Sequence, residues 1–191
     1  MKESAPDIKD LSDQLDAAQR DSRALVTDLR EERGAWRAQP GSWSVAECLD
    51  HLAAANRVYL HAMEEPAARA LKQGKLRRRP AVPGLVGSWF VKTMEPPVKA
   101  SSRMKAPWII KPRAAPALAY AFAEFEASQD EVRAFLNSFA CVDLASVRFP
   151  NPFVRGIRFS LATGLHVITA HERRHLWQAW RVRRATENAV I

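Results

Sequence analysis

Three of the five histidines in this chain have the spacing of a metal site. His171 and His175 stand four residues apart in an expected helix, so their imidazoles lie on one face, one turn apart. His51 belongs to an earlier expected helix and would supply a third nitrogen. Three nitrogen ligands leave one coordination position open, which is typical of a catalytic metal site. The sequence therefore predicts a divalent metal ion held by these three side chains.

Polar residues near the histidines could orient the ligands. Gln178 falls on the same helical face as the histidine pair and could position a ligand or a bound water. Glu47 stands one turn before His51 and could orient that imidazole. Glu47 also follows Ser44 by three residues, which is the capping-box pattern, so an N-terminal cap is the alternative role. Cys48 is either a soft metal ligand or a small buried thiol.

The other candidates have weaker patterns. His166 lies roughly 140° around its helix from His171 and should point elsewhere. His61 falls near the end of its helix and should be exposed. Arg174 and Arg148 could bind an anionic group, although arginine is usually a surface residue. Gly164, about two turns before the histidine pair, could leave room beside the site.

Four segments show apolar residues at the helical period, which predicts an all-α four-helix bundle. Gly34 is the expected end of the first helix, and Ser44 is the expected cap of the second. Pro66 should disturb the second helix, with a short continuation over 67–73. Residues 140–159 are expected to form a loop. The predicted helices span residues 8–33, 44–63, 116–139 and 161–186.

Residues 75–115 are rich in proline and cannot form a long helix. We expect one short helix over Leu85–Val91 and an ordered cover, because Trp89, Phe90 and Trp108 favour burial. The chain carries a net charge of +8, and residues 66–113 contain twelve Lys/Arg against the single acid Glu95. Such a segment is commonly a solvated surface, but it could also attract phosphates or acidic membranes.

Length and composition predict one globular domain over residues 1–191. Cys48 and Cys141 are the only cysteines, which is too few for a disulfide framework and fits a reducing compartment. The N-terminal residues lack the apolar core of a signal peptide, and no apolar run is long enough to cross a membrane. We therefore expect a cytoplasmic protein.

Two short motifs resemble those of the DinB/YfiT-like superfamily of bacterial metal-binding helical bundles. The first is Trp43-Ser44-Val45-Ala46-Glu47-Cys48-Leu49-Asp50-His51-Leu52, and the second is His171-x-x-x-His175-x-x-Gln178. The resemblance implies a four-helix bundle in which His51, His171 and His175 hold a divalent ion, often nickel or zinc. Members include thiol transferases and isomerases that use a low-molecular-weight thiol, and others thought to be hydrolases. The basic, proline-rich insertion between the second and third helices departs from that pattern.

Two functions follow as hypotheses. The leading one is a metal-dependent enzyme that adds a metal-activated thiol or water to a small electrophilic substrate, as a thiol transferase or hydrolase. The alternative is a non-catalytic metal-binding module whose basic insertion binds an acidic partner or nucleic acid. Nucleic acid is disfavoured because no DNA- or RNA-reading motif is present. A membrane-surface role for Leu85–Val91 is disfavoured because the segment is short and flanked by prolines. An apolar bundle face could pair two chains into a homodimer.

Overall fold

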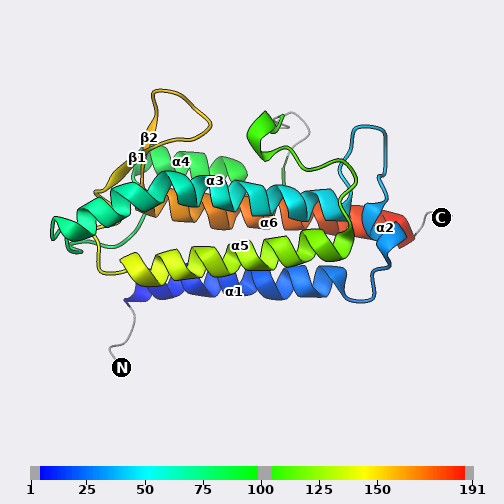
Figure 1. Cartoon of the computed structure of the whole chain (residues 1–191), viewed down its shortest axis with the longest axis horizontal. Helices are drawn as coiled ribbons and strands as arrows, with labels where there is room; N and C mark the ends of the chain where they lie inside the picture. Colours follow the sequence, from blue (N-terminus) through cyan, green and yellow to red (C-terminus); the bar gives the residue numbers. More distant parts are fainter. Residues whose placement is uncertain (1–4, 99–104, 188–191) are drawn as a thin grey trace.

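Four long helices pack side by side in the computed structural model, which describes residues 5–98 and 105–187 (Figure 1). Helix α3 contacts both α5 and α6, and α1 completes the bundle against α5 and α6. This arrangement confirms the predicted all-α bundle. The four helices are α1 (Pro6–Val26), α3 (Val45–Lys72), α5 (Leu118–Phe139) and α6 (Leu161–Glu187). No helix in the described ranges is both long enough and apolar enough to span a bilayer.

Shorter elements connect and cover the bundle. Helix α2 (Glu31–Ala35) lies between α1 and α3, and an antiparallel hairpin precedes α6. The connection between α3 and α5 contains α4, which packs on α6, and the 3₁₀ turn η2, which packs on α3. Figure 1 draws α4 and η2 above the α3–α6 pair. The bounds are Leu85–Met94 for α4, Trp108–Ile110 for η2, Arg148–Pro150 for β1 and Arg158–Ser160 for β2.

Buried polar side chains lie between two apolar clusters along the bundle. One cluster contains Leu11, Met63 and Leu136, and the other contains Leu25, Leu49 and Phe125. Between them, Asn56 of α3 donates to Ser128 of α5 at 3.2 Å and to Glu172 of α6 at 2.8 Å. Gln129 donates to the other oxygen of Glu172 at 3.1 Å. Because buried polar atoms need partners, these bonds favour one register of the three helices.

Helix α3 begins where the sequence predicts and ends later. Ser44 and Glu47 form the complete capping box, so the first turn is fixed by reciprocal hydrogen bonds. The helix then continues through Pro66 to Lys72, beyond the expected interruption. Ala67 and Ala70 on the far side of the proline are buried in the core. Their packing outweighs the one backbone hydrogen bond that proline cannot donate.

The first predicted helix is too long at its C-terminal end. Helix α1 ends at Val26, and Asp28 then adopts a positive φ of 59°, a conformation that Asp tolerates better than most residues. Gly34, the expected end, lies inside α2 instead. A Cβ on Gly34 would come within 2.6 Å of Leu118 Cδ2, so this glycine allows α2 to approach α5 closely.

Residues 140–159 include β1 and most of β2, contrary to the expected loop. Phe149 of β1 and Phe159 of β2 are paired across the hairpin, and both are buried. The prolines around this segment are typical turn residues, so the sequence predicts a loop there. The hairpin has only three residues in each strand.

The aromatic residues of the α3–α5 connection are less buried than expected. Phe90 packs partly against the core, but Trp89 is 67% exposed and Trp108 is 86% exposed. The short helix itself is present and extends to Met94.

Gly164 does not leave an open space beside the histidines. A Cβ there would lie 2.5 Å from Met63 Sδ and 2.9 Å from the Phe149 ring. The missing side chain therefore allows α6 to pack directly against α3 and the hairpin.

We predict that Gly164→Val lowers the free energy of unfolding by about 1–3 kcal/mol, because three added carbons would overpack this contact. Urea denaturation measures the change. Gly84→Val is the matched control, since a Cβ at Gly84 meets nothing within 4 Å. Equal losses in the two variants would contradict the packing argument.

Candidate metal centre

The bundle brings the three predicted histidines together. His51 lies two turns into α3, and His171 and His175 lie one turn apart on α6, which packs against α3. The ring centroids are 5.0 Å apart for His51–His171 and 4.5 Å apart for each of the other two pairs. His51 and His175 are buried, and His171 is partly buried. One potential ligand nitrogen from each ring lies within 4.8 Å of the other two.

The nitrogen spacing fits a shared cation. Nε2 of His51 and Nε2 of His171 are 3.2 Å apart. Ligand atoms about 2.0–2.1 Å from a tetrahedral zinc ion lie roughly 3.3 Å from one another. The protein therefore places two ring nitrogens at the separation that a small tetrahedral ion requires.

A backbone carbonyl fixes the tautomer of His51. Nδ1 of His51 lies 2.6 Å from the carbonyl oxygen of Ile110, which can only accept a hydrogen bond. Nδ1 therefore carries the proton, and Nε2 of the neutral ring presents its lone pair to His171. Metal-binding histidines commonly donate their second N–H to a carbonyl in this way, which sets the ring orientation.

The segment that supplies this carbonyl is tied to α3 next to His51. Asp50 accepts hydrogen bonds from the backbone N–H of Arg113 at 2.8 Å and from its Nε at 2.9 Å. The Asp50 side chain is buried, and the Arg113 guanidinium also lies over the Tyr120 ring. We call residues 105–113 the strap, because their two fixed points, Ile110 and Arg113, hold consecutive residues of α3.

Burial keeps all three imidazoles neutral at neutral pH. Loss of hydration lowers the pKa of His51 to about 4, although the Ile110 carbonyl opposes the shift. Burial also lowers the pKa of His171 and of His175 well below the usual range, and the neighbouring histidines and Arg174 add to that effect. Since an imidazole binds a metal ion only when neutral, the site is ready for a cation without first releasing protons.

His175 has an unsatisfied ring nitrogen. Its Nδ1 is buried without a hydrogen-bond partner among the described residues. Gln178, one turn later, approaches the ring and raises the pKa of His175 against the effect of burial, but it does not satisfy Nδ1. Trp43 covers one side of the three histidines. Its ring centroid lies 4.7 Å from that of His51 and 5.6 Å from that of His175. A buried orphan nitrogen within three converging imidazoles is consistent with a site for a cation.

Comparison with protein families agrees with this geometry. A model described as the DinB superfamily matches residues 14–179. The chain belongs to the DinB superfamily. The match runs from within α1 to within α6 and includes the three histidines, and it confirms the family resemblance. No curated protein and no solved structure matches the chain.

In this DinB-superfamily chain, Glu47 does not orient His51. Its carboxylate accepts from the backbone N–H of Ser44 at 2.9 Å and from Arg37 Nε at 2.8 Å. The capping alternative is therefore confirmed, and the orienting acceptor is the Ile110 carbonyl. Cys48 is fully buried, and burial strongly raises the pKa of its thiol, so it is a neutral core residue.

Glu172, between the two histidines of α6, faces the bundle interior. It accepts hydrogen bonds from Asn56 and Gln129 within the polar cluster. Burial raises the pKa of Glu172 to about 7 against these hydrogen bonds. Its carboxyl group thus connects the three helices rather than facing a substrate.

The other two histidines and the two candidate arginines lie in different places in the structure. His166 lies against the Ala81 carbonyl at 3.1 Å, and His61 is exposed, so neither joins the site. Arg148 is exposed on β1. Arg174 is buried instead, and it donates to the Thr93 carbonyl of α4 at 3.1 Å. Of the two arginines, only Arg174 contributes to lowering the pKa of His171 and of His175.

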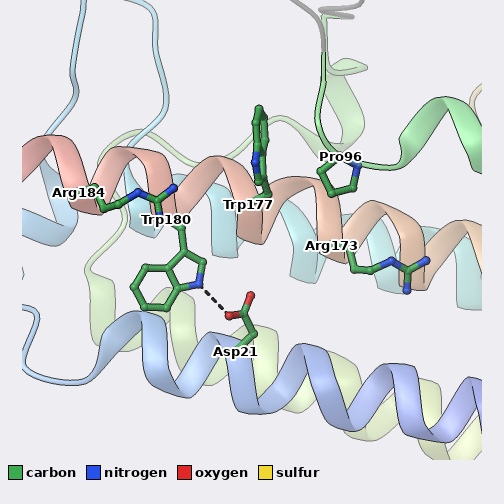
Figure 2. A pocket seen from close by; sticks show the side chains of 6 residues that line it. All are labelled: Asp21, Pro96, Arg173, Trp177, Trp180 and Arg184. Carbon is green, nitrogen blue, oxygen red and sulfur yellow. Dashed lines mark hydrogen bonds between the residues drawn. The ribbon is translucent and has the colours of Figure 1, made fainter.

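A surface hollow on another face of α6 does not belong to the site. Figure 2 shows Trp177 and Trp180 lining it. The Trp180 ring N–H donates a hydrogen bond to Asp21 of α1. Its volume is about 480 Å³. Trp177 is two residues beyond His175, which places it roughly 200° around the helix. The hollow therefore opens away from the imidazoles.

We predict that burial of neutral His51 makes the metal-free protein sensitive to mild acid. The unfolded chain binds a proton at His51 near pH 6.5, whereas the native state does so only near pH 4. The stabilising contribution is complete above pH 6.5 and is lost as the pH falls to about 4, a change on the order of 3 kcal/mol.

Urea denaturation from pH 7.5 to pH 4.5, with a chelator present, measures this dependence. His51→Gln should flatten the profile relative to the wild type. His61→Gln, at an exposed position, should leave the profile unchanged. The comparison between variants matters because Glu172, with its raised pKa, contributes stability in the opposite direction over pH 4.5–7. Parallel profiles for the wild type and His51→Gln would contradict the prediction.

Proposed function

We propose that this chain is a divalent-metal-dependent enzyme that adds a thiol or water to a small electrophilic substrate. The observation that carries the proposal is the convergence of three neutral imidazoles, with His51 locked in one tautomer by the Ile110 carbonyl. Closed structural zinc sites use four protein ligands, whereas three leave room for an exogenous ligand. The superfamily, whose members often bind metals, supports this assignment.

His51, His171 and His175 would hold the ion through one ring nitrogen each. Histidine nitrogen suits nickel and zinc, and these two are the ions we propose. A bound divalent ion lowers the pKa of water towards neutrality and stabilises a thiolate, so it supplies the nucleophile at neutral pH.

The surrounding residues have supporting tasks. Trp43 shields the rings of His51 and His175 from water on one side. Gln178 positions His175 or an incoming ligand. Arg174, a buried cation next to His175, favours a negatively charged substrate or thiolate near the site. The partly exposed His171 marks the side from which a small molecule, such as a low-molecular-weight thiol, approaches.

Enzymatic and non-catalytic forms of the hypothesis differ in the exchangeability of the fourth ligand. Cobalt-substituted protein should change its visible spectrum when a small thiol is added, because an open position accepts the thiolate. Turnover is then tested by following thiol consumption with a panel of small electrophiles. A spectrum that no thiol or inhibitory anion perturbs would favour the non-catalytic binding module.

We predict that His171→Ala weakens metal binding at least about hundredfold, since one of three ligands is removed. Elemental analysis after dialysis against equimolar nickel and zinc measures the retained ion. His61→Ala is the matched control because that histidine is exposed and outside the group. Unchanged metal content in His171→Ala would reject the ligand.

We predict that Asp50→Asn weakens metal binding by about 10–100-fold without removing a ligand. The substitution breaks the ion pair with Arg113 that fixes the strap, so the Ile110 carbonyl no longer holds His51. Isothermal titration with zinc at a temperature where both proteins are folded gives the affinity. Glu65→Gln is the control, because its pair with Arg69 on the same helix is exposed. Equal affinities for Asp50→Asn and the wild type would show that the strap does not support the site.

A further inference from the structure

Helix α4 presents an apolar face to solvent. Leu85 is 93% exposed, Val86 is 70% exposed and Trp89 is 67% exposed. Val86 and Trp89 follow Leu85 by one and four positions, so the three residues share one side of the helix. On η2, Trp108 and Ile109 are also exposed. Large aliphatic and aromatic side chains gathered in this way mark an interaction surface more often than isolated ones do.

The bundle holds this face outward rigidly. The opposite side of α4 contains buried Gly87 and Met94, and it packs on α6. A Cβ on Gly87 would lie 2.5 Å from Thr163 Oγ1, so the glycine allows the two helices to touch. Helix α4 cannot rotate to bury Leu85 without losing this contact.

Both elements also carry exposed lysines. Lys92 on α4 is exposed, and so are Lys105 and Lys111 on the strap. The single acid of residues 66–113, Glu95, is partly exposed and pairs with Arg173 of α6 at 3.0 Å. Its negative charge is therefore neutralised within the protein, and the outer surface keeps its lysines.

From this combination we propose that α4 and η2 form a docking surface for an anionic lipid bilayer. Leucine and valine enter the boundary of the acyl chains, tryptophan favours the headgroup level, and lysines contact anionic headgroups. The short length of the segment and its flanking prolines count against a membrane-surface role, but its outer residues are exposed instead of packing into the core.

Two other possible binding partners would fit this surface less well than a bilayer does. A second copy of this chain would bring two positive surfaces together, which opposes pairing through this face. Single-stranded nucleic acid could stack on the tryptophans, but Leu85 and Val86 offer it no stacking contact. The proposal is independent of the metal site, since it rests on residues outside the three histidines.

The test is co-sedimentation of the full chain with vesicles of phosphatidylcholine alone or mixed with phosphatidylglycerol. Binding should require the anionic lipid and should weaken as salt is raised. The double variant Leu85→Ser, Trp89→Ser should reduce the partition coefficient at least about tenfold. The control variant Val154→Ser, Ile157→Ser changes two exposed apolar residues near the hairpin turn and should bind like the wild type.

Several results would overturn the proposal. One is no binding to the anionic vesicles at low salt, and another is equal binding of the two double variants. Light scattering that shows a dimer lost only in Leu85→Ser, Trp89→Ser, without vesicle binding, would assign the face to a second copy. Binding of single-stranded DNA in place of vesicles would assign it to nucleic acid. Thermal melts confirm that each variant is folded.

Discussion

Burying three imidazoles within reach of one another is the constraint on which the site depends. Each ring loses hydration, so its charged form is disfavoured, and each neighbouring ring would repel a second proton. The group therefore stays neutral and keeps several ring nitrogens close together in a largely buried place. One orphan remains even so, at Nδ1 of His175. A divalent cation at this place would accept electron pairs from all three rings.

The bundle tolerates this arrangement because other polar contacts fix the helices around it. Glu172 lies beside His171 in the chain, yet its carboxylate joins α6 to α3 and α5 through Asn56 and Gln129. A shift of α6 by one residue would separate these groups as well as the histidines. The same helix therefore carries two polar faces, one that sets the register and one that presents ligands.

How much of this could be predicted depends on the separation of the contacts along the chain. The pair His171 and His175 follows from helical spacing, and the cap of α3 follows from Ser44 and Glu47. The partner of His51 could not be found in this way, because the Ile110 acceptor is a backbone carbonyl that any residue would supply. Its position depends on Arg113 meeting Asp50 across 63 residues of sequence. The course of α3 through Pro66 likewise depends on tertiary packing.

Through the strap, the proline-rich connection takes part in positioning His51. Its prolines prevent a long helix, and the chain instead crosses α3 beside the site. Within the single turn η2, Ile110 is buried and its carbonyl lies against His51, while Trp108 and Ile109 are exposed. One short segment thus contacts the candidate metal centre on its inner side and solvent on its outer side.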